Sequence, residues 1–283
     1  MRPFPKPNVL DISSMGIMLI EITGYQLKAY CDNRVITRSL EGITEVYCGY
    51  NLLVSLPELP DTIKVLSCSF NHLETLSRLP ASLEKLFCTD NKLKLLPDLP
   101  ASLKSLWCYN NGLGELPELP ESLLELRCYV NNLLLLPLLP PNLKILECSG
   151  NSLDCLPKLP EHLITLDCSD NALQKLPRLP PGLKSLDCSH NLIESLPKLP
   201  TELSCLNCVE NPLIFISSLS GNRKPIKIKV PEKFSHLFTS ENIQVYHRRY
   251  QTYLYLVSFL VIEARVLPSL LSNDHFWFPD GLY

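Results

Sequence analysis

The 283-residue chain has few of the features on which many enzyme families depend. Glycine occurs only 10 times, and neither GxGxxG nor GxxxxGKS is present, which excludes the common glycine-rich nucleotide loops. HExxH, GxSxG and protein-kinase motifs are also missing. The net charge of −3 gives no electrostatic reason to expect nucleic acid as a partner. We therefore expect a protein with no enzymatic activity, no cofactor and no metal site.

Long apolar runs and a recognisable secretory signal are also lacking. The longest candidate, residues 253–262, is far shorter than the roughly 20 residues needed to span a bilayer. The opening MRPFPKP is followed only by a short apolar stretch from Met15 to Ile20, unlike a signal peptide. The 12 cysteines do not follow the pattern of a small disulfide scaffold. These features predict a reducing intracellular compartment and make a membrane location an unfavoured alternative.

What the sequence does contain is a repeat of 20 residues. A cysteine recurs at this interval, an asparagine follows it by three positions, and an aliphatic residue, usually leucine, precedes it by two. Two prolines, three positions apart, complete each repeat, with Ser77 replacing the first proline once. The cysteines are Cys48, Cys68, Cys88, Cys108, Cys128, Cys148, Cys168, Cys188 and Cys208, and the asparagines are Asn51, Asn71, Asn91, Asn111, Asn131, Asn151, Asn171, Asn191 and Asn211.

The segment from Leu183 to Ile193, LKSLDCSHNLI, matches the leucine-rich repeat pattern LxxLxLxxNxL with cysteine in the third apolar slot. The following LPKLP forms a short LPxLP arm. These repeats resemble the 20-residue repeats of bacterial type III secretion effectors, the YopM and IpaH-like family. Similar cysteine-bearing repeats occur in amoeba-associated bacteria and giant viruses. The resemblance, from Ile43 to Leu213, implies a leucine-rich repeat solenoid and an effector acting in the cytoplasm of a host cell.

Elementary physical chemistry predicts the same architecture. Residues 185–189 alternate polar and apolar, as in a strand, with Leu186 and Cys188 directed inward. The arm has two prolines in four positions, so it favours extended polyproline-like structure over helix. We therefore expect parallel strands on the concave face and extended convex arms. We expect an N-terminal cap (1–42), an array of about eight repeats and a partial one (43–213), and a small α/β C-terminal cap (214–283).

The C-terminal cap is expected to contain a strand within Pro225–Pro231 and a helix from Tyr246 to Leu271. This helix would cover the open end of the solenoid, which repeat proteins need to protect. A role at a membrane surface or against a partner is the alternative.

The repeated cysteines and asparagines are interpreted as structural. Neighbouring strands would place the cysteine Cα atoms near 4.8 Å, a distance that tolerates disulfides, whereas a straight row cannot surround a zinc ion. We expect reduced thiols that serve as small buried hydrophobes, with Cys205 directed outward. The asparagine amides are expected to bond buried backbone groups.

The outward strand positions change character along the array. Aromatic residues dominate the first half, and small or acidic residues the second. Tyrosine and tryptophan are enriched among binding hot spots, although aromatic residues also simply favour strands. The predicted partner-binding residues are Tyr47, Tyr50, Phe70, Phe87, Trp107, Tyr109, Arg127, Tyr129, Asp167 and Asp187.

Two functions remain open at this stage. The first is a monomeric scaffold that binds a partner protein, possibly of a host, on its concave face. The second is the substrate-recognition part of an enzyme complex, such as a ubiquitin ligase, in which another chain supplies catalysis. The IpaH branch carries a catalytic cysteine beyond its repeats, and no cysteine follows Cys208 here, which favours the first function.

Overall fold

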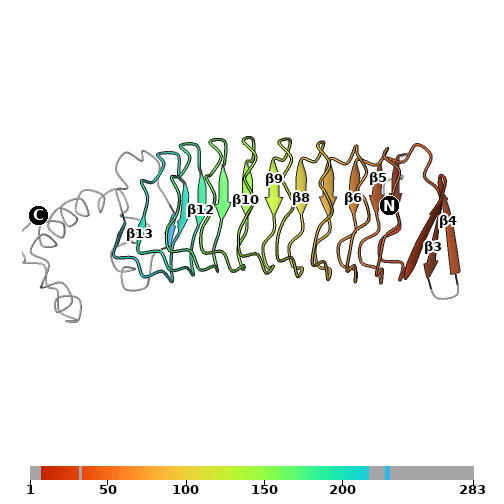
Figure 1. The fold of residues 1–283 in the computed structure, drawn as a ribbon, viewed down its shortest axis with the longest axis horizontal. Helices are drawn as coiled ribbons and strands as arrows, with labels where there is room; N and C mark the ends of the chain where they lie inside the picture. Colours follow the sequence, from red (N-terminus) through yellow and green to blue (C-terminus); the bar gives the residue numbers. More distant parts are fainter. Residues whose placement is uncertain (1–7, 32–33, 217–226, 230–283) are drawn as a thin grey trace, which may run out of the picture.

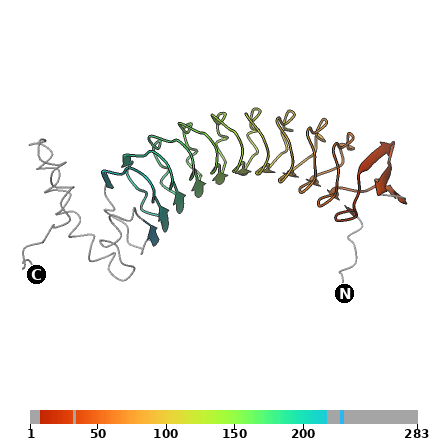
Figure 2. The same ribbon diagram turned by 90° about the horizontal axis from the view of Figure 1, so that it is seen from below.

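The computed structural model describes residues 8–31, 34–216 and 227–229, which form an arc-shaped solenoid (Figures 1 and 2). Successive coils add short parallel strands to one 11-stranded sheet, in the order β1-β5-β6-β7-β8-β9-β10-β11-β12-β14-β16. Figure 2 shows these strands along the inner side of the arc. No helix occurs among the described residues. The strands are β1 (Val9–Asp11), β2 (Leu19–Thr23), β3 (Gln26–Cys31), β4 (Arg34–Ser39), β5 (Glu45–Tyr47), β6 (Val65–Ser67), β7 (Lys85–Phe87), β8 (Ser105–Trp107), β9 (Glu125–Arg127), β10 (Ile145–Glu147), β11 (Thr165–Asp167), β12 (Ser185–Asp187), β13 (Ser195–Leu196), β14 (Cys205–Asn207), β15 (Phe215–Ile216) and β16 (Lys227–Lys229).

The constant period fixes the register of the sheet. Each strand buries its central residue and leaves its two neighbours on the concave surface, as the alternating pattern predicts. Leu166, Leu186 and Leu206 lie opposite one another in β11, β12 and β14, so identical residues form a column through the core. Because every coil contributes the same set of buried leucines, stacking removes apolar surface that one coil alone would expose to water.

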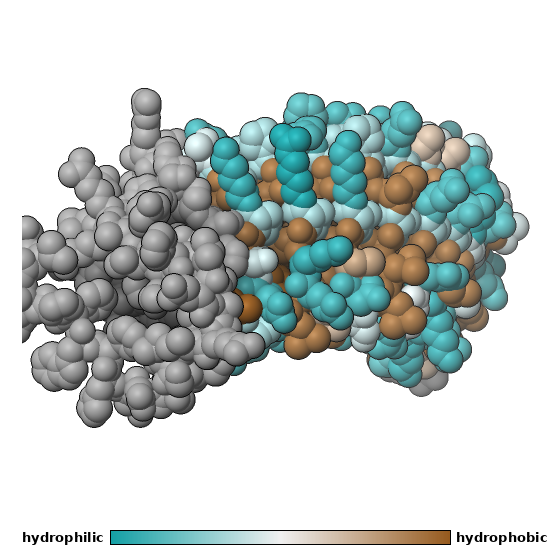
Figure 3. Space-filling model, turned by 60° about the vertical axis from the view of Figure 1, so that its left-hand side comes forward, coloured by the Kyte–Doolittle hydropathy of each residue, from teal (hydrophilic) through white to brown (hydrophobic). Residues whose placement is uncertain are grey.

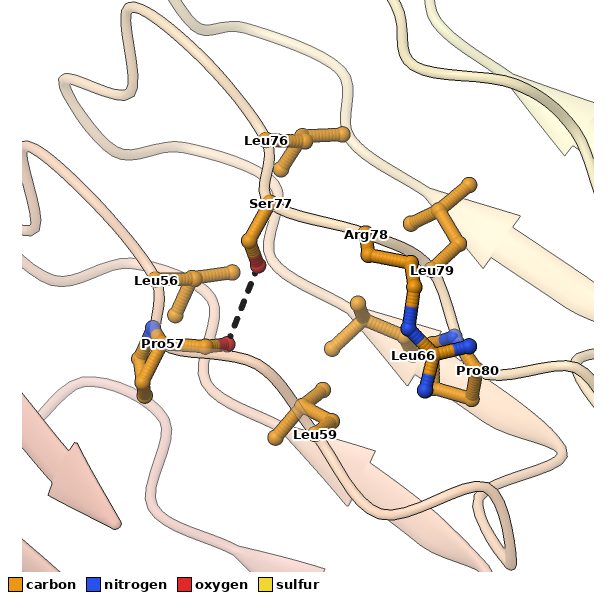
Figure 4. Close-up of a pocket in the computed structure, with 9 residues that line it drawn as sticks. All are labelled: Leu56, Pro57, Leu59, Leu66, Leu76, Ser77, Arg78, Leu79 and Pro80. Atoms are coloured by element: carbon orange, nitrogen blue, oxygen red, sulfur yellow. Dashed lines mark hydrogen bonds between the residues drawn. The ribbon is translucent and has the colours of Figure 1, made fainter.

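The convex arms are extended, as their paired prolines predict. One arm differs, because Ser77 replaces proline and donates a hydrogen bond from its hydroxyl to the Pro57 carbonyl at 3.1 Å (Figure 4). A cavity of about 10 Å³ lies beside this bond, against Leu56, Leu59 and Leu66. Such a space holds about one water molecule. This cavity is therefore a packing gap rather than a ligand pocket.

The N-terminal residues extend the sheet beyond the predicted first repeat. Strand β1 pairs in parallel with β5, so that Leu10 lies opposite Val46. Strands β2, β3 and β4 form a separate antiparallel sheet. Its residues Leu27 and Ala29 are fully buried in the same core as the coils, which covers the apolar end of the array. The domain boundaries at residues 42 and 213 stay predictions.

At the C-terminal end, β16 lies within the predicted strand Pro225–Pro231 and pairs in parallel with β14. The predicted helix from Tyr246 to Leu271, and with it the α/β character of the cap, lies outside the described residues. In the described part of the chain, no helix is long and apolar enough to cross a membrane.

A row of left-handed residues marks the exit from each strand. From Tyr50 to Glu210, the residue before each ladder asparagine has a positive φ, and only Gly150 among them is glycine. Val130 has a φ of 51° although its side chain is β-branched, a residue type for which this conformation is a clear outlier. The chain therefore accepts backbone strain at this turn in every coil.

Replacing Val130 with asparagine is expected to stabilise the protein by about 1 kcal/mol, because asparagine adopts the left-handed region more readily. Val130 is 50% exposed, so little packing is lost. Chemical unfolding would measure the change. A matched Val65→Asn variant, at an extended strand position, is expected to gain nothing, since valine favours strands there. Equal changes in both variants would contradict the strain argument.

Candidate protein-binding face

The concave face rests on a backbone that the repeated asparagines hold in place. Asn131 Oδ1 accepts a hydrogen bond from the Leu113 amide at 3.1 Å. Its Nδ2 donates to the carbonyls of Cys108, Cys128 and Tyr129 at 3.2, 3.0 and 3.3 Å. The same pattern recurs along the array, so each asparagine joins its own turn to the preceding coil. The predicted structural role of the asparagines is confirmed.

The repeated cysteines lie directly behind this face. All nine ladder thiols are buried and free, whereas Cys155 and Cys205 are exposed, as the inward and outward positions predict. Burial raises the pKa of the Cys128 thiol to about 12. No group of His, Cys, Asp or Glu side chains in the described residues is arranged to hold a metal ion.

The centre of the face is a cluster of three side chains from β7, β8 and β9. The rings of Phe87 and Trp107 meet edge to face, with 4.7 Å between their centroids. The Arg127 guanidinium lies over the Trp107 ring at 4.7 Å from its centroid, within the range of a cation–π interaction. The indole Nε1 is buried and has no hydrogen-bond partner among the described residues.

Two carboxylates hold Arg127 in this position. Its Nε donates to Glu125 Oε1 at 2.7 Å, and its Nη1 donates to Glu147 Oε2 at 3.0 Å. The pKa of Glu147 is nevertheless raised, chiefly by burial and further by the neighbouring Asp167, although Arg127 acts in the opposite direction. This carboxylate therefore lies in surroundings that favour an additional positive charge.

The other predicted aromatic residues form separate pairs rather than one continuous stripe. Tyr109 and Tyr129 stack with 4.1 Å between centroids, and Tyr50 and Phe70 stack at 4.3 Å. Tyr50 and Phe70 are exposed, but they lie at the left-handed turns and not on the strands. The strand and post-strand aromatics are only half-buried, because each covers its neighbour in the next coil. Tyr47 lies apart and donates to Glu45 at 3.1 Å.

The second half of the face is acidic, as predicted. Glu147, Asp167 and Asp187 lie opposite one another on β10, β11 and β12. Asp167 and Asp187 each accept hydrogen bonds from a serine two residues later, Ser169 and Ser189, through both the amide and the hydroxyl. These bonds fix the carboxylates while leaving their second oxygens available on the surface.

Most predicted site residues thus share one surface, although only Phe87, Trp107 and Arg127 make a compact cluster. Two contributors were not among the predicted residues. Glu125 positions Arg127, and Asn207 donates to Asp187 Oδ2 at 2.8 Å. Both lie on the face at outward strand positions, so the 20-residue frame held the signal for them.

Comparison with solved structures places these coils in a known architecture. The chain is similar to the leucine-rich effector YopM from Yersinia pestis, with 36% identity over 68% of this chain and 55% of that chain, and a TM-score of 0.65. The chain is a leucine-rich repeat protein. It is also similar to the leucine-rich repeat domain of a Shigella effector, with 29% identity over 69% of this chain and 84% of that chain, and a TM-score of 0.51.

A third leucine-rich repeat structure shares the fold. The functional domain of InlJ from Listeria monocytogenes, described as including a cysteine ladder, has 24% identity over 79% of this chain and 53% of that chain, with a TM-score of 0.59. The chain spans about half the length of the YopM structures it matches. No protein-family model and no curated protein sequence matches it. The predicted leucine-rich repeat architecture and its resemblance to effector repeats are confirmed.

Proposed function

We propose that this leucine-rich repeat protein is a non-enzymatic scaffold that binds a partner protein on its concave face. The likeness to leucine-rich repeat effectors supports a protein-interaction role. The face also provides a rigid aromatic cluster beside a row of carboxylates on consecutive strands. Such a surface suits a partner with apolar side chains toward the first half and basic side chains toward the second.

The observation that carries this proposal is the environment of Trp107. An aromatic ring favours a strand, but phenylalanine would provide the same ring without a polar group. The buried indole N–H has no acceptor in the described part of the chain, and an unsatisfied buried donor destabilises a protein. Stability therefore does not explain tryptophan at this position, whereas binding does, since tryptophan is among the residues most enriched at hot spots.

The double variant Trp107→Ala with Tyr129→Ala is expected to weaken binding of the partner by about 2 kcal/mol or more, since hot-spot truncations have this effect. Each change also removes a ring contact, so we expect a loss of stability of about 0.5–1.5 kcal/mol per contact. This loss replaces the near-neutral effect that an isolated outward side chain would have. The measurements are recovery of partner proteins from a eukaryotic cell lysate and the free energy of unfolding.

Two matched variants make this test specific. Trp107→Phe keeps the ring and removes the orphan N–H, so it should unfold no more easily than the natural protein yet recover less partner. Leu138→Asp, on the convex arm, should leave the recovered partners unchanged. If the double variant recovers the same partners as the natural protein, the concave site is wrong.

Action inside a host cell is part of this proposal. It is supported by the likeness to the effector YopM and by the free thiols, which suit a reducing compartment. Service as the recognition part of a ubiquitin-ligase complex is the second function considered, and no feature of the described face favours it.

A further inference from the structure

The convex side carries a column of exposed residues whose charge reverses at its midpoint. The column consists of the residue between the two prolines of each LPxLP arm, or at the same position in the arm containing Ser77. Its N-terminal half is mainly acidic and its C-terminal half is basic, with one leucine between them. In chain order, the exposed residues are Glu58, Arg78, Asp98, Glu118, Leu138, Lys158, Arg178 and Lys198.

The midpoint of this charge column is apolar. Leu138 is 86% exposed, and Leu134 and Leu135 of the same arm are 65% and 61% exposed. Corresponding positions in the neighbouring coils hold glycine, cysteine or charged residues. Figure 3 shows apolar bands running along the array with hydrophilic side chains projecting between them. A group of exposed leucines on one arm indicates an interaction surface, because water-exposed apolar area is unfavourable.

The charges nearest this midpoint lack partners in their own chain. Asp98, Glu118, Lys158 and Arg178 form no ion pair among the described residues. Arg78, the one cation in the acidic half, is paired with Asp61 at 3.2 Å. The unpaired charges are therefore acidic on one side of Leu138 and basic on the other.

We infer that the convex arms bind a second copy of this chain, back to back and antiparallel, about a two-fold axis through Leu138. An isologous interface places the same patch on both copies. In this register, Leu138 meets its own copy, Glu118 faces Lys158, and Asp98 faces Arg178, with each ion pair formed twice. A parallel arrangement would instead place each charge opposite an identical one, which is repulsive.

The shape of the molecule limits the size of this interface. Two arcs that meet on their convex sides touch near their middle coils, where Leu138 lies (Figure 2). Glu121 and Glu161 would also face each other across the axis, which opposes association. We therefore expect a weak dimer that buries less than about 1,200 Å². An anionic membrane fits less well, because it would repel the acidic half of the column.

Sedimentation velocity over a range of protein concentrations tests this inference with the intact protein. We expect reversible dimerisation that Leu138→Asp weakens by about tenfold or more, as expected for a charge placed at an apolar interface. Glu118→Lys and Lys158→Glu should each weaken the dimer by a similar factor, because each places like charges together. The combination of Glu118→Lys with Lys158→Glu should restore the natural affinity, since both pairs are rebuilt in reverse.

All of these positions are exposed, so the variants are expected to fold. Lys92→Glu, a charge change outside the column, serves as the control and should leave dimerisation unchanged. A protein that stays monomeric at all accessible concentrations would overturn the inference and assign the leucines to another occupant. A combined variant as weak as the single ones would equally reject the register through Leu138.

Discussion

Asn131→Ala is expected to be among the most destabilising single substitutions in this protein. The Leu113 amide makes its printed hydrogen bond to Asn131 Oδ1, so it would be left buried without that acceptor. An unsatisfied buried group costs about 1–3 kcal/mol, and each further lost hydrogen bond about 0.5–1.5 kcal/mol. With three donor bonds from Nδ2 also removed, we expect a loss of about 3 kcal/mol or more.

Chemical unfolding monitored by circular dichroism would measure this loss. The control is Asn132→Ala, because Asn132 is the adjacent asparagine but is exposed, and surface substitutions usually fall within about 0.5 kcal/mol. Similar unfolding midpoints for the two variants would show that the ladder amide is dispensable. Each coil contacts mainly its neighbours, so a broader transition is a second expected sign of weakened coupling.

The second large effect concerns thiol reactivity. The ladder thiols are expected to react with an alkylating agent at least about a thousandfold more slowly in the native protein than after unfolding. Raising the pKa of Cys128 from its ordinary value of 9.0 to about 12 lowers the thiolate fraction at pH 8 by this factor. Burial also blocks the reagent, which adds to the protection.

Mass spectrometry of the labelled protein checks this prediction residue by residue. Cys205 is expected to react first, and Cys155 more slowly, because hydrogen bonding to Asp154 raises the pKa of its thiol. Reactivity of the ladder thiols should rise as pH increases toward 12, since more thiolate forms there. Rapid labelling of Cys128 in the native state, or a mass two units lower that reveals a bridge, would contradict the buried-thiol assignment.

The sequence predicts most of this fold because the period is constant. A strict interval of 20 residues places Leu166, Leu186 and Leu206 in one column, and the paired prolines exclude helix from the arms. Strand β1 was not predicted, because Leu10 precedes Val46 by 36 positions and Ile12 replaces the ladder cysteine. The alternating VLDI of residues 9–12 was its only signal.

The candidate site is less predictable than the fold. The outward position of each residue follows from the frame, but the contact of Arg127 with Trp107 depends on side-chain conformations that the period does not specify. The same limit applies to the aromatic pairs, which bury one another and so divide the expected stripe into separate groups. Periodicity determines which residues share a face, whereas local packing determines which of them act together.

The uninterrupted period also bears on how such a gene could change. Duplicating one 20-residue unit would add a coil without disturbing the leucine, cysteine or asparagine columns, so the core tolerates arrays of different length. The surface does not share this freedom. An extra coil between Glu118 and Leu138 would shift the acidic half of the convex column away from its matching basic half. Recombination can therefore lengthen the scaffold at little cost in stability, while selection on its outer surface would keep the number of coils constant.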